Sequence, residues 1–569
     1  MSSTTSPLTS ALSGILATRS LLILWLFSGL ALALCVGLPP VQRTQEARVL
    51  ETARQLRGTG WRGWLVPRIN GTLRLQKPPL TYWIAALAYD IAGVGNTSGR
   101  MPSVISGWLT IGVTFAAGRQ IFGQRAGLVA AACLLSSYLF FRHNRLAETD
   151  SPSAMFATLA IFMWWRAVES GECGSALLFH IGAFGTAMAV MFKGGPGAYP
   201  PIFLLGFVAL RGRWSALWRF VRCGAPITLL ALAAPWFIYA QRQTRTEQFA
   251  GEVDTLFSGQ DHGATFYRYF PELVKATAPW SLVALAAFGF AIAPLVWHLF
   301  SRTTGSFVAC FAQWRMTPRA GVIVWAAAIF LPLCVIGNKQ FHYLLPLMPP
   351  VMLLVGWLLD RAMRGPTEEI PIVVYAPIDL TMLGTLLAAP AVLLVSRQMH
   401  QIRTVDWMAG ATVGLTGITV IVLYLWRGRP AALAAYLVAV FLFFPPMIGL
   451  WVPTLEPHES ADVAREIHQR YGNGPYVFYG ANYSLPLCFN LRCAIPSAHS
   501  PAQLIERATN VPHLVVIAQK KSGIAPPPVP QGFVGELTLK APGQTFDIYR
   551  SALSTTFPTT HNSSPSESR

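Results

Sequence analysis

The sequence predicts an all-α polytopic membrane domain followed by a small α/β domain. Of the 569 residues, 53% are hydrophobic and only 12% are charged, whereas soluble domains carry about 25% charged residues. Apolar runs recur along residues 21–451, and each is long enough to cross a hydrocarbon core of about 30 Å as a helix. We therefore expect a disordered cytoplasmic tail at 1–20, the membrane domain at 21–451, an extracytoplasmic α/β domain at 452–551 and a disordered tail at 552–569.

The apolar runs predict about thirteen membrane-spanning helices. The first, at residues 21–38, follows a Ser/Thr-rich tail and lacks a small-residue cleavage site, so we expect an uncleaved signal anchor with its N-terminus in the cytoplasm. The other helices are expected to begin near residues 102, 127, 152, 174, 197, 222, 280, 320, 342, 372, 407 and 431. This count places short loops rich in Lys and Arg in the cytoplasm, as the positive-inside rule requires.

Two long segments, residues 39–101 and 241–279, are then expected outside the cytoplasm. In the first, QEARVLETARQL predicts a short amphipathic helix at the membrane interface, and LTYWIAALAYDIAG predicts a second one after Pro78 and Pro79. In the second, aromatic residues interleave with Arg268 and Lys275, a composition typical of the headgroup level.

From about residue 452 the pattern changes to short helices and strands. SADVAREIHQRY and PAQLIERA predict helices, whereas PYVFYG, HLVVIAQ, GFVGELTL and TFDIYR predict strands. The domain follows an odd number of spans, which places it outside the cytoplasm. Cys488 and Cys493 flank FNLR there, and a local disulfide across a tight turn is expected if that compartment is oxidising.

The net charge of +18 does not indicate a nucleic-acid partner. Lys and Arg are spread through short loops, and this distribution favours contact with anionic membrane lipid instead.

Charged residues near the predicted outer membrane surface are the best candidates for a functional site. Glu46, Arg48 and Lys77 lie where the chain first leaves the membrane, and charges at that depth are costly unless they face water or a ligand. Lys77 precedes two prolines that stiffen the chain, and its ammonium suits a phosphate. Asp150, before Ser151 and Pro152, is expected at the external end of the fourth span.

Each of these residues also has a structural interpretation. Glu46 and Arg48 are compatible with the solvated face of an amphipathic helix, and Lys77 with a lysine that extends its ammonium to the interface. Asp150 lies in TDSPS, which is a good helix-capping sequence.

Four segments, QEARVLETAR, WLVPRINGTLRLQKPPLTYW, RLAETDSPSAMF and NKQFHYLLPLMPP, resemble those of the C-type glycosyltransferases that use polyprenyl-phosphate sugars. The resemblance is to the lipid A aminoarabinose transferases and the wider set similar to protein O-mannosyltransferases. It implies an inner- or plasma-membrane enzyme that moves a sugar from a polyprenyl-phosphate carrier to an extracytoplasmic acceptor. The acceptor would be an envelope lipid such as lipid A, or a protein hydroxyl.

The resemblance also implies roles for individual residues. It makes Glu46 and Asp150 the candidate catalytic carboxylates. The candidate contacts of the substrate are Gln45, Arg48, Lys77, Arg268 and Tyr343. Lys193, at another predicted external end, is expected to line the same site.

This sequence departs from the family pattern at two positions. Gln45 replaces the family aspartate, and an amide cannot act as a base. A base is needed for a hydroxyl acceptor but not for an acceptor that is already an anionic phosphate. In the aminoarabinose transferases, a glutamate just before the lysine and a histidine in a later loop can approach a metal. Here Gln76 replaces that glutamate, and His262 is the histidine of the later loop. A divalent metal is therefore left open, with His262 as a weak candidate ligand.

Two other functions compete with the transferase. A transporter or flippase of lipid-linked sugars would place polar groups at the bilayer midplane and often contains repeated halves. Here the polar cluster is expected at the outer surface and no repeat is visible, which favours the enzyme. A non-catalytic relative that only binds lipid-linked sugars stays open because of Gln45.

Overall fold

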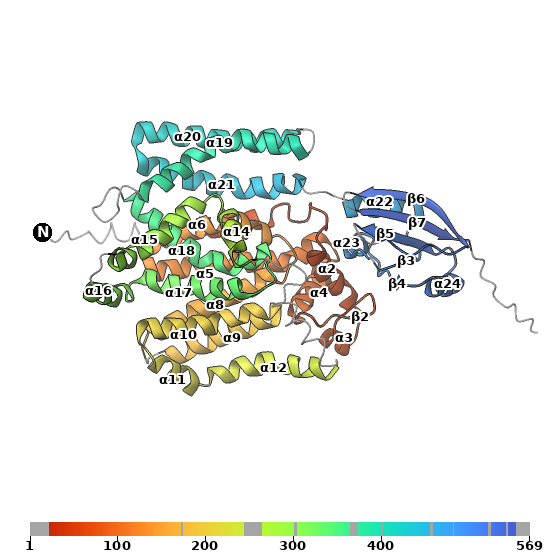
Figure 1. Cartoon of the computed structure of the whole chain (residues 1–569), viewed down its shortest axis with the longest axis horizontal. Helices are drawn as coiled ribbons and strands as arrows, with labels where there is room; N and C mark the ends of the chain where they lie inside the picture. The colour runs from red at the N-terminus through yellow and green to blue at the C-terminus, as the bar shows by residue number, and fades with distance from the viewer. Residues whose placement is uncertain are drawn as a thin grey trace, which may run out of the picture. The chain divides into compact units, whose positions relative to one another are not determined.

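The structure, a computed structural model, describes residues 22–171, 174–243, 265–300, 304–364, 374–399, 402–455, 459–481, 483–521, 525–541 and 544–552. The chain forms two compact units, which we describe separately (Figure 1). The first unit contains Met1–Pro39, Leu56–Pro67 and Arg74–Glu456, and the second contains Pro40–Gln55, Arg68–Leu73 and Pro457–Arg569.

The first unit consists of helices joined by short turns and loops in its described residues. Its helices are Leu22–Ala33, α3 (Trp61–Leu65), α4 (Leu80–Ala92), α5 (Asn96–Phe122), α6 (Gln124–Leu135), α7 (Tyr138–His143), α8 (Asp150–Glu169), α9 (Ser175–Lys193), η1 (Gly195–Ala198), α10 (Tyr199–Arg211), α11 (Ser215–Arg222), α12 (Ala225–Gln243), η2 (Phe266–Arg268), α14 (Tyr269–Thr277), α15 (Ser281–Phe300), α16 (Thr304–Trp314), α17 (Pro318–Val335), η3 (Phe341–Leu347), α18 (Met348–Met363), α19 (Tyr375–Met399), α20 (Thr404–Arg427) and α21 (Arg429–Leu455).

The prediction of a polytopic helical membrane domain is confirmed. Within the described residues, eight helices are long and apolar enough to span a membrane, or nine if α11 and α12, bent by 57°, form one span. The number thirteen stays a prediction, because several expected spans are short helices here. α6 and α10, for example, have only 12 and 13 residues.

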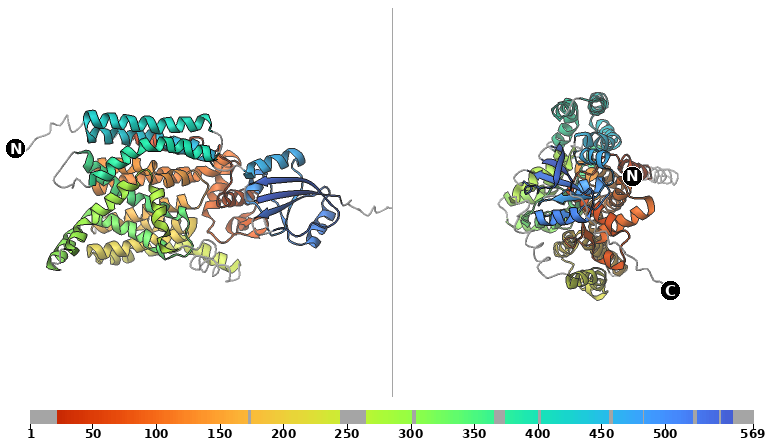
Figure 2. Two further views of the ribbon diagram at one scale, coloured as in Figure 1. Left: turned by 45° about the horizontal axis from the view of Figure 1, so that its top comes forward. Right: turned by 90° about the vertical axis from the view of Figure 1, so that its right-hand side faces the viewer.

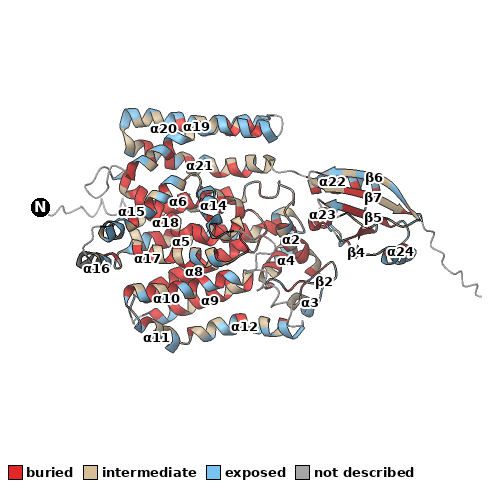
Figure 3. Ribbon diagram, in the orientation of Figure 1, coloured by how far each residue is buried: buried red, intermediate tan, exposed pale blue. Residues whose placement is uncertain are grey.

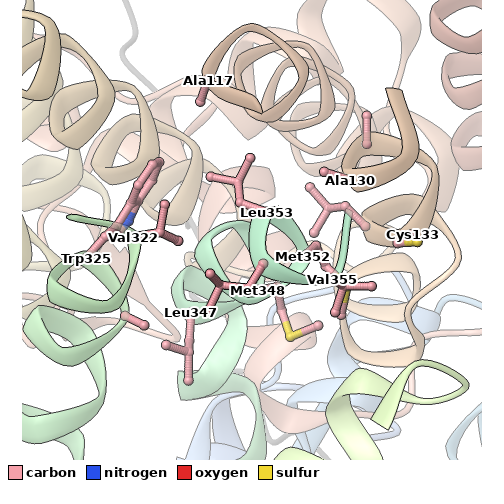
Figure 4. Packing of buried hydrophobic residues seen from close by; sticks show 14 of the residues in the cluster. Ala117, Ala130, Cys133, Val322, Trp325, Leu347, Met348, Met352, Leu353 and Val355 are labelled. Carbon is pink, nitrogen blue, oxygen red and sulfur yellow. The ribbon is translucent and has the colours of Figure 1, made fainter. Parts of the chain in front are cut away.

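Helix α18 forms the centre of the first unit. Met348, Met352, Leu353 and Val355 are all buried, and they pack among side chains of α5, α6 and α17 (Figure 4). Figure 3 shows that α8 and α18 are mostly buried, whereas α19 and α20 carry long exposed stretches. The exposed residues of α19 and α20 include many leucines, as expected for helices that face lipid.

Close approach of α5 and α6 depends on two glycines. A Cβ atom added at Gly118 would lie 2.6 Å from the Cα of Gly127. Small residues of this kind let membrane helices approach closely and gain van der Waals contact.

The second unit contains a five-stranded mixed sheet with the strand order β4-β3-β5-β7-β6. Strands β3, β4 and β5 are parallel, and β7 is antiparallel to both β5 and β6. The elements are α2 (Thr44–Leu56), the hairpin strands β1 (Arg68–Ile69) and β2 (Thr72–Leu73), α22 (Glu459–Tyr471), β3 (Tyr476–Tyr479), α23 (Leu485–Asn490), β4 (Ser497–Ala498), α24 (Pro501–Asn510), β5 (Val515–Lys521), β6 (Phe533–Ala541) and β7 (Gln544–Ser551).

Apolar clusters cover both faces of this sheet. α22 and α23 pack on the face that presents Phe478 and Ile517, whereas α24 packs on the face that presents Val477 and Val516. Figure 2 shows the helices on either side of the strands. The alternation of buried residues along β3 and β5 therefore supplies two cores. α23 and β4 were not expected from the sequence, because each is very short.

The N-terminal helix α2 belongs to this second unit, which the sequence did not predict. The Asn490 side chain donates to the Val41 carbonyl at 3.0 Å, and the Ser460 backbone N–H donates to the Gln42 side chain at 3.1 Å. α2 is a helix, as predicted, but its residues 49–53 are all buried.

Candidate active site

The carboxylate of Asp150 forms a buried ion pair with the ammonium of Lys193. Asp150 is the first residue of α8 and Lys193 is the last residue of α9, and their side chains are only 6% and 11% exposed. The two helices lie side by side (Figure 1), and the Ser153 hydroxyl donates to the Ala189 carbonyl at 3.0 Å. This packing brings the start of one helix and the end of the next to the same place.

Two residues of η3 complete this group. His342 Nε2 lies 3.8 Å from a carboxylate oxygen of Asp150, and Lys193 Nζ lies 4.1 Å from the centre of the Tyr343 ring. An ammonium at that distance from an aromatic face is stabilised by the electrons of the ring. Asp150, Lys193, His342 and Tyr343, hereafter the Asp150 cluster, therefore form one connected set of charged and aromatic groups. The sequence identified three of the four, and only His342 was not singled out.

A second buried pair supports the Asp150 cluster. His143 Nδ1 lies 2.9 Å from a carboxylate oxygen of Glu148, and both side chains are 2% exposed. The rings of His143 and His342 stack with their centres 5.7 Å apart. His143 and Glu148 were not among the candidates expected from the sequence, although His and Glu five residues apart, shortly before Asp150, were a visible signal in RHNRLAETD.

The segment around Lys77 packs against the last turn of α9. Leu75 lies in an apolar cluster with Met191, and the Thr81 hydroxyl donates to the Phe192 carbonyl at 3.2 Å. Since Lys193 follows Phe192, the chain on both sides of Lys77 is held beside the helix end that carries Lys193. Lys77 itself is half-buried.

Arg268 has an acidic partner that the sequence interpretation did not anticipate. Its guanidinium lies 3.2 Å from a carboxylate oxygen of Glu272, and its side chain is 57% exposed. Arg268 ends η2, and the following helix α14 contacts η3, which carries Tyr343. Within the described residues, Asp150 forms ion pairs with Lys193 and His342, whereas Arg268 pairs with Glu272.

An apolar cavity of about 310 Å³ lies among α14, α15, α17 and α18. Phe270 and Leu273 of α14 and Leu347 at the end of η3 are among its lining residues. Phe270 follows Arg268 by two residues, and Leu347 follows Tyr343 by four. Lining residues of the cavity are therefore close in sequence to Arg268 and Tyr343, two of the candidate phosphate contacts.

The first acidic motif lies in the second unit. Glu46 is 1% exposed, whereas Gln45 and Arg48 are half-buried. The alternative in which Glu46 lies on the solvated face of an amphipathic helix is therefore wrong, because the packing around α2 covers that side chain.

Helix α2 is also held by a polar network that the sequence did not reveal. Arg54 donates two hydrogen bonds, at 2.8 and 2.6 Å, to the buried carboxylate of Glu51. The Gln55 amide donates to Glu51 at 2.6 Å and to the Asn70 side chain at 2.9 Å. Asn70 in turn donates to the Cys488 sulfur at 3.7 Å, which links α2 and the β1–β2 hairpin to α23.

The expected disulfide between Cys488 and Cys493 is absent, and both thiols are free. The prediction is wrong, although both residues lie at the core beneath α22, and the Cys488 sulfur accepts a hydrogen bond from Asn70 instead. Burial raises the pKa of Cys488 to about 12 and that of Cys493 to about 11.

A metal site is not built by the described residues, where no group of three or more His, Cys, Asp or Glu side chains is arranged to hold an ion. His262, the weak candidate ligand, lies outside the residues that the structure describes. Gln76, which replaces the glutamate of the related enzymes, is exposed.

Comparison with known proteins supports the resemblance. Residues 76–239 match the family described as dolichyl-phosphate-mannose-protein mannosyltransferase. An uncharacterized protein of Aquifex aeolicus is 26% identical over 326 residues, which are 56% of this chain and 60% of the relative. An undecaprenyl phosphate-alpha-4-amino-4-deoxy-L-arabinose arabinosyl transferase of Edwardsiella ictaluri is 24% identical over 334 residues, 56% of this chain and 55% of the relative. The chain thus matches little more than half the length of these two relatives.

The likeness to a solved structure extends over nearly the whole chain. The crystal structure of ArnT from Cupriavidus metallidurans bound to undecaprenyl phosphate superposes with a TM-score of 0.67 at 18% sequence identity. It covers 94% of this chain and 97% of that protein. The resemblance drawn from the four motifs is therefore confirmed, and the chain has the fold of this ArnT.

Proposed function

We propose that this protein transfers a sugar from a polyprenyl-phosphate carrier to an acceptor on the extracytoplasmic face of the membrane. The acceptor class that the relatives favour is lipid A or a similar envelope lipid, and a protein hydroxyl is the second candidate. One observation carries the proposal. The buried Asp150 cluster lies beside the Lys77 segment, and η3, which supplies His342 and Tyr343 to the cluster, also reaches the apolar cavity.

The cavity and the cations suit the two halves of such a donor. A polyprenyl chain is apolar and fits a cavity lined by Phe270, Leu273 and Leu347. Its phosphate is anionic, and Lys77, Arg268 and the Tyr343 hydroxyl are donors of the kind that bind phosphate oxygens. In the transfer, the bond between the anomeric carbon and the phosphate oxygen breaks and a bond to the acceptor oxygen forms. Polyprenyl phosphate leaves with the electron pair.

Asp150 serves in this scheme as an orienting carboxylate. Its ion pair with Lys193 keeps it charged and fixed, and a fixed charge needs no reorganisation when charge develops on the reacting atoms. A phosphate acceptor brings an oxygen that is already anionic, so Gln45 is compatible with transfer to a lipid phosphate. A hydroxyl acceptor would need Glu46 or Asp150 to take its proton.

The test is a transfer assay on the purified protein in lipid nanodiscs. Undecaprenyl-phosphate sugars are supplied with lipid A or with Ser/Thr peptides, and mass spectrometry follows the mass of each acceptor. Asp150→Asn and Lys77→Ala are compared with Lys540→Ala, which removes an exposed lysine from β6. Loss of one charge-assisted contact to the substrate costs about 1.5–3 kcal/mol, so we expect at least a tenfold loss of rate in the first two variants and no loss in the third.

The outcomes distinguish the competing functions. A mass gain on lipid A that both site variants lose would support the proposal, and Gln45→Asp should then leave the product unchanged. Donor binding without any acceptor product would favour the non-catalytic relative. Donor appearance in the opposite leaflet, measured with a fluorescent carrier, would favour the transporter.

A further inference from the structure

A second and larger cavity, of about 1310 Å³, lies in the first unit. It is lined by the last turns of α5 and α18, by the second half of α15 and by the first turn of α17. η3, which supplies His342 and Tyr343 to the Asp150 cluster, directly precedes α18. The larger cavity lies at the other end of α18. Sixteen helical residues separate the two sites, or about 24 Å at 1.5 Å per residue.

The lining of this cavity is strongly basic. Arg319, Arg361 and Arg364 are among its residues, and Asp360 is its one carboxylate. Asp360 lies 2.5 Å from the guanidinium of Arg364, so that pair is nearly neutral and the remaining lining is positive. The guanidinium carbons of Arg319 and Arg361 lie 5.9 and 5.7 Å from the centre of the Trp357 ring. Two like charges are thus held close to a single aromatic ring.

Two further features indicate an anion. The Nε of Arg319 is buried and has no hydrogen-bond partner among the described residues. The N-terminus of α17 opens into the same cavity, since Thr317 and Pro318 line it and Thr317 caps the helix by accepting from the Ala320 N–H. A helix N-terminus carries partial positive charge and favours anions.

The surroundings indicate that this anion belongs to a lipid. Phe122, Phe290 and Trp297 share the lining with the arginines. Trp297 and the nearby Phe300 of α15 are 75% and 77% exposed, although α15 is one of the candidate membrane spans. Side chains this apolar at the end of a span face hydrocarbon, so an acyl chain can lie against α15 while its headgroup enters the cavity. Free phosphate would use the arginines but not these aromatic rings.

We propose that this cavity binds the phosphate headgroup of an anionic membrane lipid, at the end of α18 opposite the Asp150 cluster. Arg319 and Arg361 are the principal phosphate contacts, and Trp357 holds their guanidinium groups side by side. The proposal does not depend on the transferase activity. Basic pockets between membrane helices are a recurrent means of recognising anionic headgroups.

The test is native mass spectrometry of the full chain released from detergent with defined lipids. We expect phosphatidylglycerol to bind more tightly than zwitterionic phosphatidylcholine. Each interfacial arginine contributes about 1 kcal/mol, so Arg319→Gln and Arg361→Gln should each weaken phosphatidylglycerol binding about fivefold. Arg125→Gln, an exposed arginine in the first turn of α6 that does not line the cavity, is the matched control and should have no effect.

Two additional arms keep the test decisive. Arg319→Lys keeps the charge at that position, so it should preserve the lipid preference even if Arg319→Gln misfolds. Glycerol phosphate at millimolar concentration should not compete with phosphatidylglycerol. Equal affinity for the two lipids, equal losses in Arg361→Gln and Arg125→Gln, or displacement of the lipid by glycerol phosphate would each overturn the proposal.

Discussion

The buried ion pair between Asp150 and Lys193 predicts a large stability effect of a kind that a surface pair cannot produce. Lys193→Met removes the ammonium and leaves the Asp150 carboxylate buried, with its side chain only 6% exposed. Breaking a buried pair by removing one partner costs about 3–5 kcal/mol, because the remaining charge loses its compensation. Asp150→Asn should cost a similar amount by leaving the Lys193 ammonium buried.

The double variant isolates the interaction itself. Once both charges are gone no uncompensated charge remains, so the combined loss should fall short of the sum of the single losses by about 1–3 kcal/mol. The free energy of unfolding is measured by SDS titration in mixed micelles, monitored by tryptophan fluorescence.

Arg57 and Asp90 provide the matched control within the same unit. Their side chains are 36% and 47% exposed and their charged atoms are 2.6 Å apart. Exposed pairs of this kind contribute about 0.2–1 kcal/mol. A coupling energy for Asp150 and Lys193 no larger than that of Arg57 and Asp90 would refute the reasoning, since burial would then have added nothing.

Four further predictions concern helix packing, thiol reactivity, the pH dependence of stability and hydrogen bonding. Gly127→Ala should lower the free energy of unfolding by about 1–3 kcal/mol, because its Cβ would lie 2.6 Å from the backbone of α5, whereas Gly289→Ala, with nothing within 4 Å, should not destabilise. Iodoacetamide should modify Cys488 and Cys493 slowly at pH 8, as their raised pKa values keep both thiols protonated. Because the two thiols lose their protons at lower pH in the unfolded chain than in the folded one, their contribution to folding stability is complete below pH 9. It should be lost as the pH rises toward 11–12, and thermal unfolding at a series of pH values would show this loss. Gln55→Ala should destabilise the second unit by about 1–3 kcal/mol, measured by proteolysis rates, because it removes the partners of the Asn70 backbone N–H and of the Asn70 side-chain oxygen.

Sequence reasoning succeeded where a local pattern fixes the outcome. Long apolar runs predicted a helical membrane domain because backbone groups in hydrocarbon must be satisfied within the helix. TDSPS predicted the start of a helix, and α8 does start at Asp150. The predicted capping role of Asp150 is wrong, because Thr149 occupies the N-cap position and Asp150 is the first helical residue. Composition predicted a change from long helices to short helices and strands near residue 452, and the five-stranded sheet occurs in that part of the chain.

Sequence patterns did not predict contacts that form only when elements far apart in the chain pack together. No local signal shows that Lys193 reaches Asp150 or that His342 joins them, since these residues meet only after α8, α9 and η3 have packed. The disulfide prediction failed because spacing alone does not show that Cys488 faces Asn70. His143 was passed over because it lies outside the motifs that carried the family resemblance. Glu148 lies within RLAETDSPSAMF, but nothing local in the sequence shows that it pairs with His143.

The attachment of α2 to the C-terminal sheet has a consequence for the order of synthesis. Gln42 and Asn70 contact Ser460 and Cys488, in both cases across 418 residues. At 5–20 residues per second, a ribosome needs roughly 20–80 s to make the second partner after the first. Until then the helix that carries Gln45 and Glu46 lacks the polar contacts that hold it in the second unit. The segment with Gln45 and Glu46 is therefore made early, but its contacts with the C-terminal sheet form only late in synthesis. A chain truncated before the sheet would lack these contacts.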